Sequence, residues 1–201
     1  MIPFKKLLSN IFRFLLCLIS SELSRDFNIV FHFISDTKHA DISKNILNAL
    51  ILAEDKRFFF HVGIDPIAIA RAIWSFLTKK TLQGASTIEQ QLVRTITKRY
   101  DLSISRKLRE IFLASLISTS FPKEQMARAY LSIAYFGWQM NGIDQACARL
   151  LIQPANASPL DAAQIIARLK YPEPEAASPK RHQQIRTRIL HILKLTAGDV
   201  T

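Results

Sequence analysis

Apolar residues recur along most of the chain at the three- to four-residue spacing that places them on one face of an α-helix. The clearest case is the segment 42–53, whose apolar residues are Ile42, Ile46, Leu47, Leu50 and Ile51. The same pattern predicts further helices over residues 67–77, 87–96, 106–118, 123–135, 144–151, 159–169 and 179–195. Strand signals are few: Asn28–Ile34 is the best candidate, and 135–142 is a turn-rich connector. We therefore expect a mainly α fold.

Polar residues that favour helix ends support these boundaries. Asp41 or Ser43 can cap the helix at 42–53, and Ser103 or Ser105 can cap the helix that begins near Arg106. Their side-chain oxygens accept hydrogen bonds from the free N–H groups of a first turn. The predicted helices are therefore separate elements joined by short loops.

The N-terminal stretch MIPFKKLLSNIFRFLLCLISSEL begins with cations and continues with apolar residues, as targeting segments do. Asn10 and Arg13 interrupt it, and its longest apolar run is Phe14–Ile19. A membrane-spanning helix needs roughly 20 predominantly apolar residues. The pattern favours an amphipathic helix, on a membrane surface or in the core, over a transmembrane span. We expect residues 1–40 to form an amphipathic or membrane-associated segment and 41–201 to form the main domain.

Composition narrows the class of protein. The chain has 201 residues, 49% of them hydrophobic, which suits one domain that could consist of two lobes. The net charge of +11 indicates an anionic partner such as nucleic acid, anionic lipid or a phosphorylated substrate. Cys17 and Cys147 lie in apolar surroundings, so we expect core residues and no disulfide. The histidines show no metal-ligand spacing, which argues against zinc.

The stretch AEDKRFFFHVGIDP places Glu54 and Asp55 at the end of the first predicted helix, followed by phenylalanines and His61. A carboxylate at a helix C-terminus lies in an unfavourable field and needs compensation or a function. In an aromatic setting its affinity for a proton rises, as suits a general acid or base. Alternatively, both acids face solvent or pair with Lys56 and Arg57. From these residues alone, both interpretations stay open.

The stretch GASTIEQQLVR combines small residues with a helix start. Ser86 or Thr87 can cap this helix, and its free N–H groups can bind an anion. Gln90, Gln91 and Arg94 project from the turns that follow. An ordinary capped helix is the alternative.

The stretch RKLRE places Arg106 and Lys107 on the same helix face as Glu110, at i, i+4 and i, i+3. With Arg94 and Arg109 nearby in sequence, the segment suits a diphosphate, because guanidinium groups bind phosphate oxygens in pairs. A solvated charged face is the alternative. With the two preceding stretches, this one suggests acid–base chemistry on a substrate with a phosphorylated leaving group.

These stretches resemble the motifs of the peptidoglycan glycosyltransferases, glycosyltransferase family 51. EDKRFFFHVG resembles their E-D-x-x-F-x-x-H-x-G, GASTIEQQLVR their G-[GA]-S-T-I-T-Q-Q-x-V-K, and RKLRE their R-K-x-x-E. KEQMARAYLSIAYFGWQMNGID is similar to the fourth motif, and SPLDAAQIIARLKYPEPEAASPKRHQQIRTRIL to the closing segment. The motifs come in family order over about Asn45 to Leu193. The resemblance implies a mainly α, lysozyme-like domain with a small jaw lobe on the membrane.

The family reaction implies roles for particular residues. The 4-hydroxyl of lipid II attacks a lipid-linked glycan and polyprenyl diphosphate leaves. Glu54 would be the general base, and Glu110 the second glutamate, which positions groups and can act through a divalent metal, Mg or Mn. No organic cofactor and no metal held by the protein alone are implied. The substrate-binding residues implied are Asp55, His61, Ser86, Thr87, Gln90, Gln91, Arg94, Arg106, Lys107 and Arg109.

Several positions depart from the family pattern. Glu89 replaces the usual Thr, which would place an acid beside the diphosphate site, and Arg94 replaces Lys. Arg128 and Ser132 replace Glu and Asn in the fourth motif, and Leu102 stands near a frequent arginine. Because both main glutamates are present, we expect an active enzyme. A weakened member that only binds cell-wall precursors is one alternative, and a lysozyme-like glycan hydrolase is another.

The resemblance also predicts partners and location. We expect lipid II, lipid-linked glycan, the membrane surface and other cell-wall synthesis proteins as partners, and no nucleic acid. The expected site of action is the outer or periplasmic face of the bacterial cytoplasmic membrane. Too little chain follows Leu193 for a transpeptidase region, so a monofunctional enzyme is expected.

Overall fold

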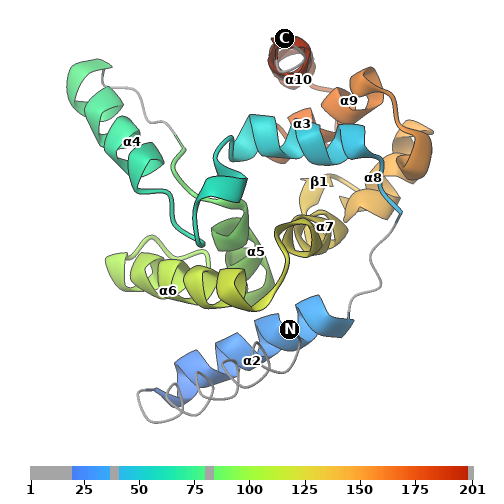
Figure 1. Cartoon of the computed structure of the whole chain (residues 1–201). Coiled ribbons are helices and arrows are strands. Elements are labelled where there is room, and N and C mark those ends of the chain that lie inside the picture. The colour runs from blue at the N-terminus through green and yellow to red at the C-terminus, as the bar shows by residue number, and fades with distance from the viewer. Residues whose placement is uncertain (1–19, 37–40, 80–83, 199–201) are drawn as a thin grey trace. The chain divides into compact units, whose positions relative to one another are not determined.

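The structure is a computed structural model that describes residues 20–36, 41–79 and 84–198. The chain divides into two units: unit 1 comprises Met1–Thr37 and Arg57–Met126, and unit 2 comprises Lys38–Lys56 and Ala127–Thr201. Helices make up nearly all the regular structure in both (Figure 1), which confirms the predicted mainly α class. Among the described residues, no helix combines the length and apolar character needed to cross a bilayer. Most of the predicted N-terminal segment, residues 1–19, lies outside the described residues, and its role stays a prediction.

Unit 1 is centred on α5, on which α2 and α6 pack. Its elements are α2 (Ser21–Asp36), η1 (Phe58–Phe60), α4 (Pro66–Lys79), α5 (Ile88–Thr97), α6 (Ile104–Ser120) and the start of α7 (Lys123–Ile133). Helices α2, α5 and α6 pack on one another (Figure 1). Their contact is apolar, and its fully buried residues include Val30, Leu92 and Ile117. This packing fixes the direction in which the polar faces of α5 and α6 point.

Helix α4 differs from its neighbours because most of its large apolar side chains face outward. Asp65 begins the helix by accepting hydrogen bonds at 3.0 Å from the N–H groups of Ile67 and Ala68. Pro66 occupies the first turn, as expected. The exposed apolar residues are Ile67, Ile73, Trp74, Phe76 and Leu77, each more than half exposed. The described part of α4 therefore presents a row of apolar side chains to solvent.

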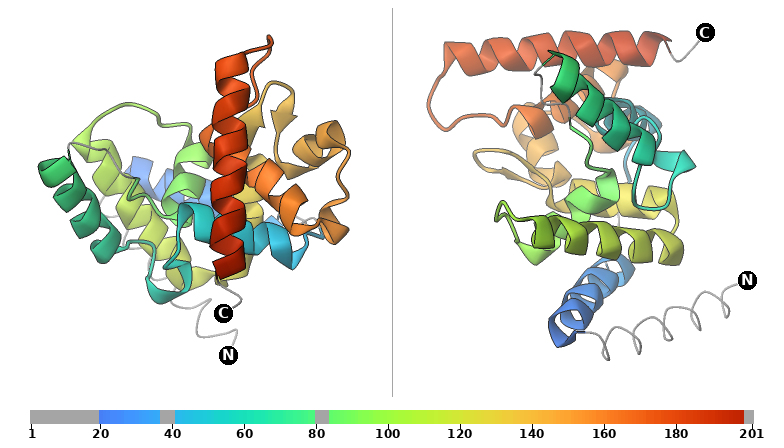
Figure 2. Two further views of the ribbon diagram at one scale, coloured as in Figure 1. Left: turned by 90° about the horizontal axis from the view of Figure 1, so that it is seen from above. Right: turned by 90° about the vertical axis from the view of Figure 1, so that its left-hand side faces the viewer.

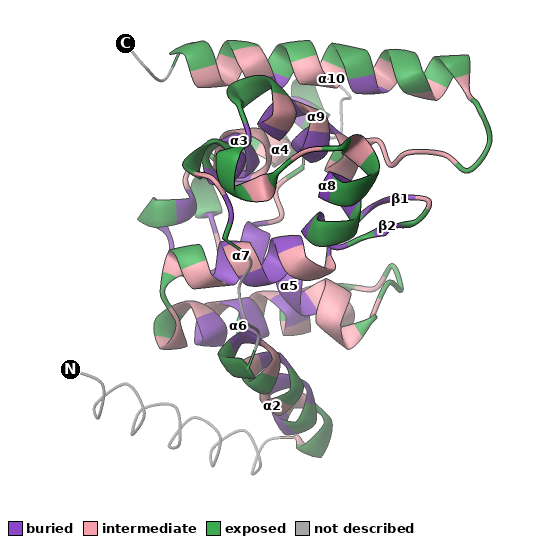
Figure 3. Ribbon diagram, turned by 90° about the vertical axis from the view of Figure 1, so that its right-hand side faces the viewer, coloured by how far each residue is buried: buried purple, intermediate pink, exposed green. Residues whose placement is uncertain are grey.

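Unit 2 is organised around α9 (Pro159–Lys170). Its other elements are α3 (Lys44–Glu54), the end of α7, β1 (Tyr135–Gly137), β2 (Met140–Asn141), α8 (Ile143–Leu150), η2 (Pro154–Asn156) and α10 (Pro179–Gly198). Helix α3 packs on α9, and α10 lies against both (Figure 2). The strands β1 and β2 form an antiparallel hairpin that packs on α8 and α9. In the described helix α10, Ile185 and Ile192 are the buried residues, and much of the rest of the helix is exposed (Figure 3).

One sequence prediction is wrong, and one is incomplete. Residues 28–34 are helical and not a strand, because Phe27, Val30 and Ile34 bury one face of the longer helix α2. A short apolar run fits either a strand or part of a helix, and the length of the whole element is needed to distinguish them. The connector at 135–142 contains the β1–β2 hairpin. Of the caps, Ser43 and Ser103 are the residues used.

Candidate active site

Glu54 is the last residue of α3, in unit 2. Its carboxylate Oε1 lies 3.2 Å from Nη2 of Arg188, which comes from α10. The same Nη2 donates a hydrogen bond to the carbonyl oxygen of Ala53 at 2.8 Å. The Glu54 side chain is 18% exposed, so the carboxylate is shielded but accessible. The sequence suggested a pair with Lys56 or Arg57 or an aromatic setting; the contact found is with a distant arginine.

Asp55 ends α3 and is buried, with its N–H bonded to the carbonyl oxygen of Ile51 at 2.9 Å. Its predicted contact with substrate stays a prediction.

The loop after the phenylalanines belongs to unit 1. Phe58 is fully buried, and His61 lies edge-on to it with ring centroids 6.3 Å apart. Phe59 and Phe60 are exposed. Phe58 and His61 therefore anchor the loop, whereas the other two phenylalanines present apolar surface. The predicted contact of His61 with substrate stays a prediction.

The start of α5 holds this loop in place. Thr87 caps α5 by accepting a hydrogen bond from the Gln90 N–H at 3.3 Å, and its hydroxyl donates to the carbonyl oxygen of Gly63 at 2.9 Å. The side-chain amide of Gln90 donates to the same oxygen at 3.0 Å. Thr87 and Gln90 are both buried. Their contacts are structural, while Ser86 and Gln91 are half-buried; the substrate role of all four stays a prediction.

Glu110 is the centre of a charged cluster in unit 1. Its Oε2 accepts from Nη1 of Arg106 at 2.5 Å, and its Oε1 accepts from Nζ of Lys107 at 2.8 Å. Lys107 also donates to Ser86 Oγ at 2.9 Å and to Gln90 Oε1 at 2.7 Å. Glu110 is 3% exposed and Lys107 35%. The predicted i, i+3 and i, i+4 pairs are present, and they form a partly buried network around a buried carboxylate and not a fully solvated face.

This network does not fit a metal on Glu110. Both carboxylate oxygens already accept hydrogen bonds from cationic side chains. A divalent ion would need at least one of those oxygens and would be repelled by Arg106 and Lys107. We therefore derive no step through a metal here.

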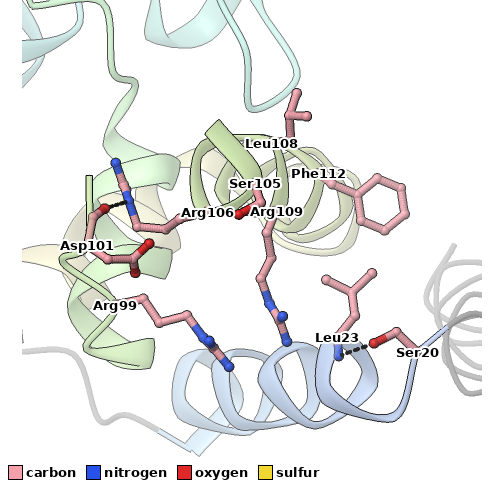
Figure 4. A pocket seen from close by; sticks show the side chains of 9 residues that line it. All are labelled: Ser20, Leu23, Arg99, Asp101, Ser105, Arg106, Leu108, Arg109 and Phe112. Carbon is pink, nitrogen blue, oxygen red and sulfur yellow. Dashed lines mark hydrogen bonds between the residues drawn. The ribbon is translucent and has the colours of Figure 1, made fainter. Parts of the chain in front are cut away.

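Arg109 does not join the Glu110 cluster. Residues that are two apart in sequence lie on nearly opposite sides of a helix, so Arg109 is directed away from Lys107. Its Nε lies 3.0 Å from Asp26 Oδ2, and its Nη1 lies 3.2 Å from Glu22 Oε2, both on α2. Arg99 contacts the same two acids, and with Arg109 it lines a pocket of about 350 Å³ (Figure 4). Arg109 was grouped with Arg106 and Lys107 because they are close in sequence, but they lie on different faces of α6.

Arg94 lies closer to the cluster. It lines a small cavity of about 10 Å³ together with Arg106 and Glu110. It is half-buried, and its predicted phosphate role stays a prediction.

Glu89 is directed into the interior of unit 1. It is 0% exposed, and its Oε1 accepts from the Lys123 ammonium and from Ser118 Oγ at 3.4 Å. Its Oε2 has no hydrogen-bond partner within the described part of the chain. The Lys123 ammonium also lies 4.7 Å from the centroid of the Phe58 ring. The acid at this departure from the family pattern is therefore paired with a lysine in the core.

Two residues that pair with acids described above, Arg188 and Lys123, were not among the site residues expected from the sequence. Each lies far along the chain from the acid it contacts, by 134 and 34 positions. Helix periodicity reports only neighbours on one helix, so no signal of that kind could find them. Of the remaining departures, Arg128 lies 3.5 Å from the carbonyl oxygen of Ile42, and Ser132 bonds to its own helix.

Comparison with known proteins shows which family the chain belongs to. A family model described as "Transglycosylase" matches residues 34–196. Penicillin-binding protein 1A of Rickettsia prowazekii is 28% identical over 163 residues, which are 79% of this chain and 21% of that protein. Penicillin-binding protein 1A of Haemophilus influenzae is 35% identical over 133 residues, 66% of this chain and 16% of that protein. Penicillin-binding protein 2a of Streptococcus pneumoniae is 37% identical over 134 residues, 66% of this chain and 18% of that protein.

The chain thus spans about a fifth of the length of the curated relatives it matches. The family model, in contrast, extends over most of the chain and includes every motif described above. The chain therefore belongs to the transglycosylase family.

Proposed function

We propose that the protein polymerises peptidoglycan glycan strands by transferring a lipid-linked glycan chain onto the 4-hydroxyl of lipid II. The observation that carries the proposal is the partly buried network of Arg106, Lys107 and Glu110 beside the start of α5. It contains two cations and one carboxylate, so a positive charge remains for an anionic group. A glycan hydrolase has no need of such a group, because its substrate carries no diphosphate.

Glu54 is the proposed general base. As the 4-hydroxyl oxygen bonds to the anomeric carbon of the donor, the bond from that carbon to the diphosphate oxygen breaks. The hydroxyl proton passes to Glu54, and polyprenyl diphosphate leaves with the bonding electrons. A carboxylate that is 18% exposed can reach a substrate while its partner holds it in place.

Arg106 and Lys107 are the proposed electrostatic stabilisers of the leaving group. Their donors are held in place before substrate binds, by Glu110 and by Ser86 and Gln90. Donors that are fixed in advance stabilise developing negative charge without the cost of reorganisation. Glu110 is a positioning residue in this scheme.

The exposed apolar face of α4 supports a membrane surface as partner. A polyprenyl substrate resides in a bilayer, and Trp74 and its apolar neighbours can enter the interface. The positive charge of the chain adds attraction to anionic lipid. We place the activity at the outer or periplasmic face of the bacterial cytoplasmic membrane, with no nucleic-acid partner.

Incubation of the purified protein with labelled lipid II, in detergent with and without Mg²⁺ or Mn²⁺, tests the proposal. The expected product is a ladder of glycan strands on a gel. Binding of lipid II without any ladder would favour a precursor-binding protein. Shortening of preformed glycan would favour a hydrolase.

A further inference from the structure

A single nitrogen of Arg188 contacts both a backbone carbonyl in the last turn of α3 and the side chain of Glu54. Nη2 donates to the carbonyl oxygen of Ala53 at 2.8 Å and lies 3.2 Å from Oε1 of Glu54. The side chains of Arg188 and Glu54 are 12% and 18% exposed. Helix α10, which carries Arg188, packs on α3 and α9 in the same unit (Figure 2). The guanidinium thus joins α10 to the C-terminal end of α3.

The end of α3 is an unfavourable place for a carboxylate. The last carbonyl groups of a helix lack partners within it and form the negative end of its dipole. A guanidinium at this point satisfies one carbonyl and offsets the field that opposes ionisation of Glu54. Since arginine stays protonated at all accessible pH values and its donors are planar and rigid, it also fixes the direction of the carboxylate.

His191, on the same helix as Arg188, has several cations nearby. Desolvation lowers the pKa of His191 from its usual 6.5, and nearby cations lower it further. Those cations are Arg188 and Lys194 on α10, Lys170 at the end of α9, and Lys56, which follows α3. Among them, Arg188 is in direct contact with Glu54 in the described part of unit 2.

We propose that Arg188 is a positioning residue that keeps Glu54 ionised and aimed for proton abstraction. This inference rests on the proposed function, because it assigns to Arg188 a part in that reaction. A base must be deprotonated before the acceptor hydroxyl attacks. Arg188 keeps Glu54 deprotonated down to a lower pH. It also restricts the orientations that the carboxylate can take.

The test compares wild type with Arg188→Gln, which removes the charge, and Arg188→Lys, which keeps the charge but not the planar fork. Arg186→Gln, on the exposed side of the same helix, is the matched control. Initial rates of lipid II polymerisation are measured against pH. In parallel, the Glu54 carboxyl is titrated by carbon-13 NMR and assigned by its absence in Glu54→Gln. Thermal unfolding checks that each variant is folded.

In Arg188→Gln we expect kcat to fall about tenfold with KM within about twofold, because one lost charged contact corresponds to about one factor of ten. We also expect the acid-side midpoint of the rate and the Glu54 titration to move to higher pH. Arg188→Lys should retain the midpoint and recover part of kcat. An unchanged midpoint, a loss confined to KM, or a rise in kcat would overturn the inference.

The two proposals fail in different ways. If wild type makes no polymer but the Glu54 titration still moves in Arg188→Gln, the proposed function is wrong while the coupling of Arg188 to Glu54 stands. If wild type polymerises and the titration does not move, the inference about Arg188 is wrong and the proposed function stands.

Discussion

The side-chain amide of Gln90 donates a hydrogen bond to the carbonyl oxygen of Gly63 at 3.0 Å. Thr87 donates to the same oxygen, so one backbone carbonyl joins the loop that carries His61 to the start of α5. Gln90 also accepts from Lys107, which bonds to Glu110. Three stretches that lie apart in sequence thus form one hydrogen-bonded network in unit 1.

Gly63→Ala should destabilise this loop. The backbone φ of Gly63 is +74°, and an added Cβ would lie 2.4 Å from backbone atoms of Ala114. We expect the free energy of unfolding to fall by about 2 kcal/mol or more, from strain and the clash together. Urea denaturation measures it. Gly84→Ala is the control, since its Cβ meets nothing within 4 Å; equal effects at both positions would contradict the account.

The ion pair of Glu89 with Lys123 should stabilise the fold, because each charge compensates the other where they are shielded from water. In Glu89→Gln the lysine loses its carboxylate, and we expect a loss of about 2 to 3 kcal/mol. This is less than for a fully buried pair, because Lys123 keeps 19% of its side chain exposed. A double-mutant cycle with Lys123→Met, read by urea denaturation, should show strong coupling. Additive effects would mean that the two charges do not stabilise each other.

Substitutions of Arg106 and Arg109 should have different effects: the first on ligand binding, the second on stability. Arg106→Ala should weaken lipid II affinity about tenfold, by loss of a charge-assisted contact of about 1.4 kcal/mol. Arg109→Ala should lower the free energy of unfolding, because Arg109 forms ion pairs with Glu22 and Asp26 of α2. Fluorescence binding and urea denaturation separate the two effects, with Lys44→Gln as an exposed control. Unchanged affinity in Arg106→Ala would remove the basic cluster from the substrate site.

Cys147 should make stability depend on alkaline pH. Burial first, then Asp144 and Asp161, raise the pKa of this thiol from 9.0 to about 11. The unfolded thiol ionises more readily, so its contribution to stability is complete below pH 9 and is lost as pH rises toward 11. The loss should reach about 2 kcal/mol, at about 1.4 kcal/mol for each pH unit. Urea denaturation of wild type against Cys147→Ala measures it; parallel pH dependence in both would contradict it.

The local part of the fold could be predicted from the sequence. Helix periodicity and caps such as Ser43 and Ser103 mark boundaries because they depend on neighbours along the chain. The strand prediction at 28–34 failed because a short apolar run fits both structures until its partners are known. The pairs of Glu110 with Arg106 and Lys107 were predicted for the same local reason.

Contacts across the fold could not be predicted in this way. Arg188 reaches Glu54 only because α10 packs on α3, and Lys123 reaches Glu89 only because α7 begins beside α5 in unit 1. Arg109 was misplaced because cations were grouped by distance in sequence and not by helix face. The motifs identified the residues that carry charge, whereas tertiary packing determines which charge each one meets.

The most direct measurement of the central claim is polymerisation of labelled lipid II by wild type, Glu54→Gln and Glu124→Gln. Glu124 is an exposed acid in the first turn of α7 and is the matched control. If Glu54 is the general base, its variant should lose the glycan ladder, by about 100-fold or more in rate, while lipid II binding and thermal unfolding stay unchanged. The Glu124 variant should match wild type. Turnover in Glu54→Gln at a rate near that of wild type would contradict the account.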